Sequence, residues 1–297
     1  MLSRVMARTI SIVGAGRVGQ SLGKRLHKLG WRIGAVVAQS KKTARAAVRA
    51  IGAGTPHSHI TPQALDADVI LLTTPDGALE KVASALARFG PHNCRAKIVL
   101  HTSGALDRAV LAPLARCGAS TGSLHPMQTF SGRGMPRLEG VIFAVEGDRA
   151  ALRAARGIAR ALGGTPVEIR GKNKPAYHAA GALVAGHGLA LMEAATRMLM
   201  KLGFSRPRAL QALLPLIRQM LDNYERLGPQ AAWTGPISRG DYATVAKHGK
   251  ALGLYPREFK DAYAALALLA ARVLSKQPAA TRRKIERALK NSRGGAI

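Results

Sequence analysis

The 297-residue sequence has no long apolar run and only two cysteines. Its most apolar stretch, Ala262–Ala271, is too short to cross a bilayer and lies between Asp261 and Arg272, so we expect no membrane partner. Cys94 and Cys117 lack the paired spacing of a metal or redox site, and we interpret both as free thiols in a reducing compartment. These absences favour a cytoplasmic protein and give no metal site.

Acidic residues are also scarce, with 16 Asp and Glu against 45 Lys and Arg, and the net charge is +29. A field of this sign attracts polyanions and anionic substrates. Specific nucleic-acid binding would need basic residues clustered beside aromatic ones, but here they are spread over the chain and aromatic residues make up 4% of it. We therefore expect a solvated basic surface without a specific nucleic-acid partner, and non-specific polyanion binding as a side effect.

Glycine, by contrast, is abundant and has a recognisable arrangement near the amino end. A short apolar strand, Thr9–Val13, precedes a glycine-rich turn and an amphipathic helix, and a second strand follows at Ile33–Ala38. In a dinucleotide-binding turn the first glycine permits the bend, the second lets the backbone approach a pyrophosphate, and the third lets helix and strand pack closely. We expect cofactor binding by the residues of this turn: Gly14, Ala15, Gly16, Arg17, Val18 and Gly19.

The segment after the second strand has no acidic residue, and the first one in the chain is Asp66. A site for NAD usually places Asp or Glu here to hold the ribose hydroxyls. Ser40, Lys41 and Lys42 stand there instead, and such hydroxyl and cationic groups suit a 2′-phosphate that a carboxylate would repel. Unless these residues only belong to the general surplus of basic residues, the segment predicts NADP (NADPH) as the cofactor, with Ser40 and Lys41 among its ligands.

Strands and helices alternate up to residue 170, and only helices follow. Further strands are expected at Asp68–Thr73, Lys97–His101, Ala119–Leu124, Val141–Val145 and Thr165–Ile169. Helical periods of Ala and Leu then predict helices at Lys174–Leu202, Arg206–Arg226, Asp241–Leu252, Arg257–Ser275 and Pro278–Asn291. The expected fold is an α/β Rossmann-like doubly wound sheet followed by an all-α domain. Residues 1–170 would bind NAD(P), and residues 171–297 would enclose a substrate cleft against them.

Polar or turn-forming residues follow the expected strands at the edge where parallel sheets bind ligands. We expect cofactor contacts from the residues at these strand ends: Thr74, Pro75, His101, Ser103 and Gly104. Asp76 equally fits the cap of the next helix. His101 and His125 are candidates to hold the nicotinamide carboxamide or a substrate oxygen, or else they are satisfied polar residues at strand ends. Their spacing offers no third ligand for a metal.

Five segments of the chain resemble one known family: Gly14–Gly19, His101–Gly104, Leu124–Phe130, Tyr177–Ala180 and Thr234–Asp241. The chain resembles bacterial proteins that have a Rossmann-like domain followed by a helical domain of unknown function (DUF2520 type) and are described as NADP oxidoreductase-like. They are distant relatives of ketopantoate reductase, pyrroline-5-carboxylate reductase and the β-hydroxyacid dehydrogenases. The resemblance implies this fold, a nicotinamide cofactor and a homodimer formed through the helical domain, but no particular substrate.

In those relatives a catalytic lysine is followed four residues later by asparagine. Here Lys174 is followed at that spacing by His178, and residues four apart share a helix face. Reduction of C=O or C=N leaves charge on oxygen or nitrogen, so a proton donor or cation must lie beside it. A partly buried Lys174 suits this role, and the imidazoles of His178 and His125 can donate or relay a proton. The alternatives are a solvated Lys174 and a His178 that is hydrogen-bonded within the packing.

The turn-rich segment Thr234–Asp241 lies among the expected helices. The planar fork of Arg239 suits a carboxylate or phosphate, and we predict substrate binding by Arg239, Asp241 and His125. A structural loop, with Asp241 as a helix cap paired to Arg239, is an equal alternative. The function predicted is an NADP-dependent oxidoreductase that transfers a hydride between the nicotinamide and a small, anionic carbonyl or imine substrate. The alternative is a non-catalytic dinucleotide-binding regulatory or scaffold protein.

Overall fold

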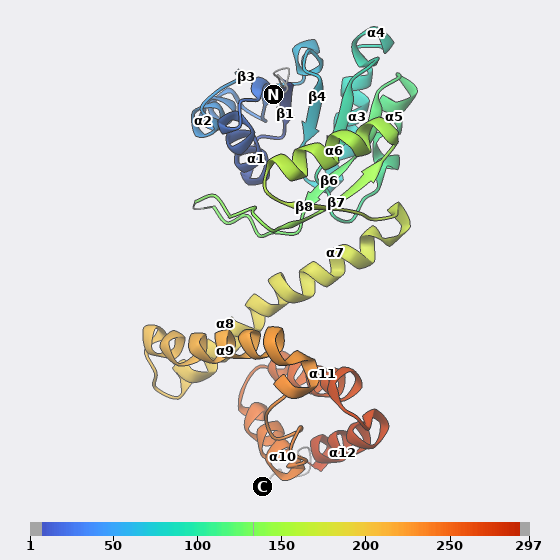
Figure 1. Ribbon diagram of the computed structural model, residues 1–297. Coiled ribbons are helices and arrows are strands. Elements are labelled where there is room, and N and C mark those ends of the chain that lie inside the picture. The colour runs from blue at the N-terminus through green and yellow to red at the C-terminus, as the bar shows by residue number, and fades with distance from the viewer. Residues whose placement is uncertain (1–7, 133, 292–297) are drawn as a thin grey trace. The chain divides into compact units, whose positions relative to one another are not determined.

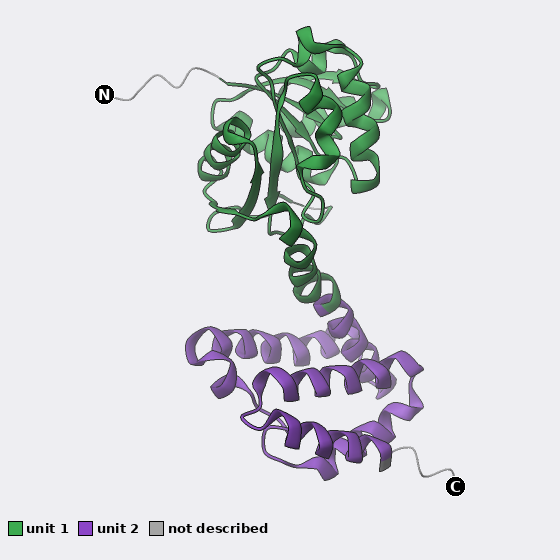
Figure 2. Ribbon diagram, turned by 90° about the vertical axis from the view of Figure 1, so that its right-hand side faces the viewer, with its two compact units in different colours: residues 1–187 green, residues 188–297 purple. Residues whose placement is uncertain are grey.

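The computed structural model describes residues 8–132 and 134–291 and divides into two compact units, residues 1–187 and residues 188–297 (Figure 2). Sequence analysis places a domain boundary at residues 170/171, where the last strand gives way to helices. The first compact unit also includes the helix that follows this point, because Lys174 in the first turn of that helix is hydrogen-bonded to the sheet.

An eight-stranded sheet forms the centre of the first unit, in the order β3-β2-β1-β4-β5-β6-β7-β8 (Figure 1). The strands are β1 (Thr9–Val13), β2 (Arg32–Val37), β3 (Thr55–His57), β4 (Val69–Leu72), β5 (Ile98–His101), β6 (Ser120–Pro126), β7 (Ile142–Gly147) and β8 (Thr165–Glu168). β1 to β6 run parallel, β7 is antiparallel to β6, and β8 runs parallel to β7. The predicted α/β Rossmann-like class is confirmed, and β3 is the strand that the sequence analysis misses.

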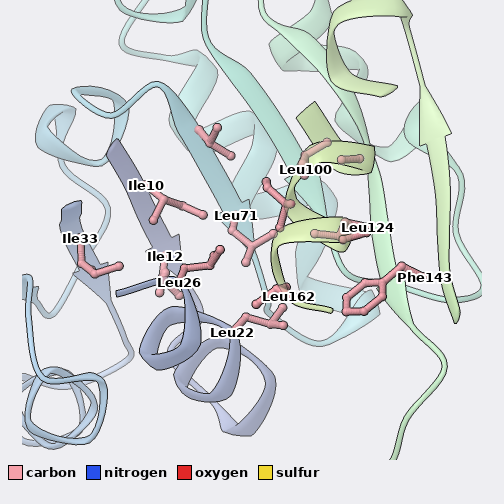
Figure 3. Packing of buried hydrophobic residues seen from close by; sticks show 14 of the residues in the cluster. Ile10, Ile12, Leu22, Leu26, Ile33, Leu71, Leu100, Leu124, Phe143 and Leu162 are labelled. Atoms are coloured by element: carbon pink, nitrogen blue, oxygen red, sulfur yellow. The ribbon is translucent and has the colours of Figure 1, made fainter. Parts of the chain in front are cut away.

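Helices cover both faces of this sheet. The first face carries α1 (Arg17–Lys28), α2 (Lys41–Ile51) and α6 (Arg149–Ala161); the second carries α3 (Leu79–Ala87), α4 (Pro91–Cys94) and α5 (Ala112–Arg116). Because side chains alternate along a strand, Leu71 of β4 joins the first core and its neighbours Ile70 and Leu72 join the second. Figure 3 shows the first core, where Leu22 and Leu26 of α1 pack toward Ile12. Both faces are therefore closed by apolar contacts, and polar side chains gather at the strand ends.

Short 3-10 turns interrupt the connections at Pro62–Leu65, Asp76–Ala78, Arg108–Leu111, Gly171–Asn173 and Leu252–Leu254. After the sheet, α7 (Lys174–Ala182) and a π-helical turn at Leu183–His187 complete the first unit, and α8 (Gly188–Lys201) begins the second. The second unit continues with α9 (Arg206–Ala232), α10 (Tyr242–Ala251), α11 (Arg257–Leu274) and α12 (Pro278–Asn291). The helical carboxyl-terminal region is thus confirmed.

Two of the predicted helices differ from the observed ones. The helix predicted over Lys174–Leu202 is interrupted by the π-helical turn, and α9 extends past its predicted end with a kink at Gly228, whose φ is 77°. The kink has a local cause, because Pro229 follows Gly228 and lacks the N–H that a regular helix would use. Within residues 8–132 and 134–291, no helix combines the length and the apolarity that a bilayer crossing requires.

Candidate active site

The glycine-rich turn between β1 and α1 has the geometry of a phosphate-binding turn. Gly14 has a φ of 94°, and a Cβ atom there would lie 2.6 Å from the backbone nitrogen of Thr74. A Cβ on Gly19 would lie 2.5 Å from the hydroxyl of Thr73, so α1 packs too closely on the strands for any larger residue. A Cβ on Gly16, by contrast, would point into open space, and no side chain caps α1 at this end. The free helix N-terminus and the open approach over Gly16 fit a pyrophosphate.

The ribose end of the expected cofactor site lies where β2 leads into α2. The hydroxyl of Ser40 accepts a hydrogen bond from the backbone N–H of Thr43 at 3.1 Å and so caps α2. Lys41 and Lys42 are exposed in the first turn of the helix. Ser40 therefore has a structural role as well as a predicted one, and the two lysines present their cations to solvent beside it. This arrangement fits a 2′-phosphate.

Arg17 in the glycine-rich turn and the residues that follow β4 are further predicted cofactor ligands. The Arg17 guanidinium lies against the β6–β7 connection, since a Cβ on Gly132 would be 3.4 Å from its Nη2. The Oγ1 atom of Thr74 is buried and has no hydrogen-bond partner among the described residues, while Pro75 is exposed. Asp76 accepts a hydrogen bond from the Ser103 hydroxyl at 2.8 Å and caps no helix. The cap interpretation of Asp76 is therefore wrong, and its carboxylate instead ties β4 to the turn after β5.

His101 lies fully buried at the end of β5, with both ring nitrogens engaged inside the chain. Nδ1 accepts the backbone N–H of Ser103 at 3.2 Å, and Nε2 lies 3.2 Å from the carbonyl oxygen of Asp107. Nδ1 must therefore be the bare nitrogen and Nε2 the donor. Burial, reinforced by the charge of Lys174, lowers the pKa of His101 to about 3, so the ring is neutral. His101 shapes the turn, and its predicted contact with a cofactor would require this packing to open.

The hydroxyl of Ser103 is similarly occupied. It donates to Asp76 and accepts the backbone N–H groups of Ala105 at 3.2 Å and Leu106 at 3.0 Å. Cofactor contact through its side chain stays a prediction. Gly104 has a clear steric reason to be glycine, because a Cβ there would meet ring atoms of two histidines, one of which belongs to α7.

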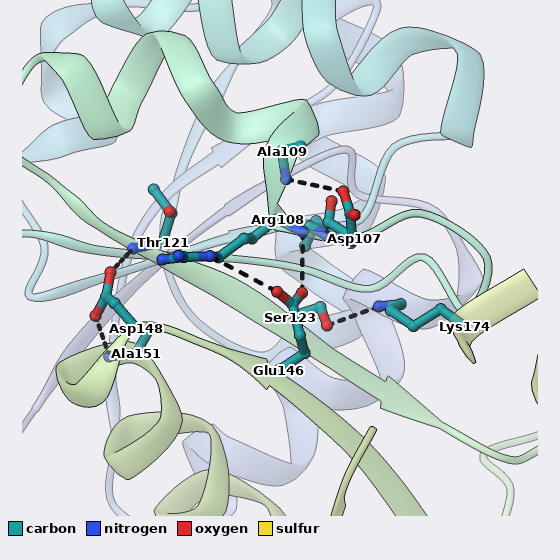
Figure 4. A network of polar contacts seen from close by, with 10 residues as sticks. Asp107, Arg108, Ala109, Thr121, Ser123, Glu146, Asp148, Ala151 and Lys174 are labelled. Carbon is teal, nitrogen blue, oxygen red and sulfur yellow. Dashed lines mark hydrogen bonds and ion pairs between the residues drawn. The ribbon is translucent and has the colours of Figure 1, made fainter. Parts of the chain in front are cut away.

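Lys174 is the first residue of α7 and has no exposed surface. Its ammonium group donates to the hydroxyl of Ser123 at 2.7 Å (Figure 4). It also donates to the carbonyl oxygen of Ser103 at 2.9 Å. Desolvation lowers the pKa of Lys174 to about 8, against the opposing attraction of Glu146 and Asp107. The solvated interpretation of this lysine is therefore wrong: it is a buried cation tied to β6 and to the turn after β5.

His125, Tyr177 and His178 form the accessible part of this cluster. The Nδ1 atom of His125 lies 3.0 Å from the Tyr177 hydroxyl, and the His125 and His178 rings meet edge to face at 5.8 Å. A Cβ on Gly104 would lie 2.7 Å from Nε2 of His125 and 2.6 Å from Cδ2 of His178, so both rings lie over that glycine. Burial lowers the pKa of His125 to about 4, with the charges of Lys174 and His178 acting in the same direction.

Sequence analysis missed Ser123 and Tyr177 as site residues, although their spacing from predicted site residues indicates that they share a face with them. Ser123 stands two residues before His125, and alternate residues of a strand share a face. Tyr177 stands three residues after Lys174, so both residues and His178 share one face of α7. The strand period would thus have grouped Ser123 with His125, and the helix period would have grouped Tyr177 with Lys174 and His178.

The other two predicted substrate ligands belong to the second unit. Asp241 caps α10, because it accepts the backbone N–H of Thr244 at 3.0 Å and its hydroxyl at 2.7 Å. These two hydrogen bonds lower the pKa of Asp241. Arg239 is exposed, and among the described residues no ion pair joins it to Asp241. Asp241 thus has the structural role that the sequence left open, and substrate binding by either residue stays a prediction. In the described ranges, no group of three His, Cys, Asp or Glu side chains is placed to hold a metal ion.

The fold and the glycine-rich turn define a Rossmann-like protein, and comparison with known proteins agrees with this class. Two family models match the chain: a Rossmann-like domain over residues 3–126 and the domain of unknown function DUF2520 over residues 141–270. The chain therefore carries a Rossmann-like domain followed by DUF2520, which confirms the resemblance found in the sequence. No protein of curated function matches it in sequence.

Solved structures share the fold over most of the chain. A Bacteroides fragilis protein provisionally described as an NADP oxidoreductase is 21% identical, with a TM-score of 0.73 over 94% of this chain and 98% of its own. A Streptomyces aurantiacus imine reductase is 16% identical, with a TM-score of 0.60 over 86% and 93% of the two chains. A reductive aminase from Aspergillus terreus, solved with NADPH and ethyl-5-oxohexanoate, is 19% identical, with a TM-score of 0.61 over 98% and 97%. At such identities these likenesses establish the fold alone.

Proposed function

We propose that this protein is an NADP-dependent oxidoreductase acting on a small, anionic carbonyl or imine compound. The observation that supports this most strongly is the position of two features on one edge of one sheet. The open glycine-rich turn follows β1, and the accessible imidazole of His125 lies near the end of β6, which runs parallel to β1 through β4 and β5. Cofactor phosphates bound at the turn and a polar reacting group would then lie along the same carboxyl edge of the sheet.

Each part of the site has a separate task. NADPH, when bound, supplies the hydride. The backbone of the turn and the N-terminus of α1 hold the pyrophosphate, while Ser40, Lys41 and Lys42 bind the 2′-phosphate. Thr74 and Pro75 border the nicotinamide from the end of β4. The strongly basic chain, with a net charge of +29, favours an anionic substrate over a neutral one.

The polar cluster stabilises the charge that develops on the substrate oxygen or nitrogen. His125 and His178 are the accessible members and would contact the substrate or relay a proton to it. Lys174 would act through its charge and without contacting the substrate, since its ammonium group is fully buried and already donates to Ser123 and Ser103. A fixed positive charge in a low-dielectric setting stabilises a nearby anion without having to touch it.

We also propose a homodimer formed through the helical domain, in a cytoplasmic protein. In the second unit, α9 exposes large apolar side chains at the spacing of one helix face: Leu216 (68% exposed), Met220 (47%), Tyr224 (57%) and Leu227 (56%). A contiguous apolar stripe of this size on a soluble chain usually marks an interface.

The burial of Lys174 also supports a second candidate, a dinucleotide-binding protein without turnover. With no exposed surface and two hydrogen-bond acceptors within 3 Å, Lys174 makes no direct contact with the solvent from which a substrate would come. Such a protein would bind NADPH but oxidise it with no member of a panel of keto acids and cyclic imines. The enzyme hypothesis requires at least one of these compounds to be consumed together with NADPH.

Titration with NADPH and with NADH, followed by nucleotide fluorescence, tests the cofactor prediction. We expect NADPH to bind more tightly, and a Lys41→Ala/Lys42→Ala variant to lose about tenfold or more in NADPH affinity, since hydrogen bonds to charged groups contribute roughly 1.5–3 kcal/mol each. NADH binding should change little. Lys28→Ala, at the opposite end of α1 from the turn, is the control and should change neither affinity. Equal or tighter binding of NADH by the wild type would contradict the assignment.

A further inference from the structure

We infer that Tyr177 is a positioning residue that holds His125 as the Nε2–H tautomer, and that this N–H donates the hydrogen bond which polarises the reacting C=O or C=N group. The role of the Nε2–H group toward a substrate rests on the proposed function. The tautomer of His125 concerns only this chain and can be measured without cofactor.

The geometry leaves one nitrogen of His125 engaged and one available. Nδ1 lies 3.0 Å from the Tyr177 hydroxyl, and the two rings meet edge to face at a centroid distance of 5.5 Å and an angle of 87°. Nε2 has no hydrogen bond to any described residue, and it is not among the buried atoms that lack a partner. It lies so close to the backbone of Gly104 that a Cβ there would be 2.7 Å away, and only glycine keeps this nitrogen free of contact with a side chain.

The direction of the Tyr177–His125 hydrogen bond follows from the chemistry of the two groups. Burial raises the pKa of Tyr177 to about 12, so the hydroxyl keeps its proton, and it lies 3.0 Å from Nδ1 of His125. A phenol O–H is a better donor than a neutral imidazole N–H, and a bare imidazole nitrogen is a better acceptor than a phenol oxygen. The hydroxyl therefore donates to Nδ1, and the ring proton of a neutral His125 must then be on Nε2.

The surroundings of His125 keep it neutral. Lys174, Tyr177 and His178 face it from α7, and His101 faces it from the neighbouring strand β5. None of these groups is an anion, and the ammonium of Lys174 repels a second positive charge. A neutral imidazole cannot deliver a proton as an imidazolium would. It can donate a strong hydrogen bond to a developing oxyanion, and the charge of Lys174 makes that bond stronger.

Nitrogen-15 NMR of the uniformly labelled protein without cofactor tests the tautomer directly. Long-range correlations should identify a neutral His125 with a bare Nδ1 and a protonated Nε2, with a His125→Asn variant to assign the signals. In Tyr177→Phe the two tautomers should both become populated. A wild-type spectrum with the proton on Nδ1, or a Tyr177→Phe spectrum without any change in the tautomer ratio, would overturn the inference.

The chain contains a matched control pair in its second unit. The Tyr263 hydroxyl lies 3.0 Å from Nδ1 of His248, and those rings also meet edge to face, at 5.8 Å. Tyr263→Phe should therefore alter the nitrogen signals of His248 and leave those of His125 unchanged. If Tyr177→Phe does not fold, the wild-type spectrum alone still decides which nitrogen carries the proton.

Kinetics then separate the two halves of the inference. With a carbonyl or imine that the wild type consumes, Tyr177→Phe should lower kcat about three- to tenfold and leave the KM for NADPH unchanged. A protein with the expected tautomer that consumes no such compound would contradict the proposed function. A wild type that turns over while Tyr177→Phe retains full kcat would contradict the role of Tyr177 and leave the proposed function intact.

Discussion

Three residues of the candidate site show how position alone gives chemically similar groups different roles. His101 and His125 follow neighbouring parallel strands, yet both nitrogens of His101 are engaged inside the chain and one nitrogen of His125 is available. Lys174 provides the positive charge that disfavours a further proton on either ring. The site therefore contains one buried cation and two neutral imidazoles, which makes it sensitive to acid.

We expect the free energy of unfolding to fall as the pH decreases below about 6.5. The pKa of His125 is lowered to about 4 in the folded protein, so between these values the unfolded chain binds a proton that the native state does not. The stability that neutral His125 contributes is complete above pH 6.5 and is lost toward pH 4, with a slope of at most about 1.4 kcal/mol per pH unit. Urea denaturation at a series of pH values from about 7 down to about 5 measures this slope, because that range begins just above the ordinary pKa of histidine.

In His125→Asn the slope should become shallower, while His92→Asn, which removes an exposed histidine of α4 outside the cluster, serves as the control and should keep it. His101 adds to the slope in the same direction, because its pKa is also lowered, to about 3. An unchanged slope in His125→Asn would contradict the neutral assignment of this ring.

At the scale of elements, the antiparallel pair of β6 and β7 and the helix α6 behind it determine where the polar cluster lies. Asp148 at the start of α6 accepts the backbone N–H groups of Ala150 and Ala151 at 3.1 Å each, and that of Thr121 on β6 at 2.7 Å (Figure 4). One carboxylate thus caps a helix and ties it to the strand that carries Ser123 and His125.

We expect Asp148→Ala to lower the free energy of unfolding by about 2 kcal/mol, because it removes a helix cap and leaves a strand N–H of β6 without its partner. Asp148→Asn retains one oxygen acceptor and should cost less. Asp222→Ala, which removes an exposed ion pair with Arg226 and an exposed hydrogen bond from Gln219, is the control and should change stability by less than about 0.5 kcal/mol. Urea denaturation compares all three, and equal losses for Asp148→Ala and Asp222→Ala would contradict the role of the cap.

At the scale of the whole molecule, the two units have different kinds of surface and core. The first unit encloses two large apolar clusters around its sheet, whereas the described core of the second is small and centres on Ala267, Ala271 and Ile285. Large apolar side chains remain exposed on α8, α9 and α11. A helical unit with so little enclosed apolar surface would gain stability in the proposed homodimer.

Light scattering coupled to gel filtration tests this pairing. We expect the wild type to elute at twice the mass of one chain and a Leu216→Glu/Met220→Glu variant to shift toward the monomer, since two charges on the α9 stripe would be desolvated in the interface. Leu29→Glu introduces a charge at an exposed leucine of the first unit and serves as the control. A monomeric wild type would contradict the proposed homodimer.

The sequence by itself determined the features that depend on local period and on residue type. The glycine-rich turn, the α/β order and the lack of an acid after the second strand are visible within short windows, because a strand repeats every two residues and a helix every 3.6. The faces shared by Lys174, Tyr177 and His178, and by Ser123 and His125, also follow from these periods.

Only the tertiary structure decided which of these side chains is buried and which nitrogen is available. Lys174 donates to residues 71 and 51 positions earlier in the chain, and no window of sequence contains both ends of such contacts. Burial and pKa depend on everything packed around a group, and that packing joins residues from β5, β6 and α7. The sequence therefore predicted a polar cluster at this edge, and the fold assigned its members their separate places.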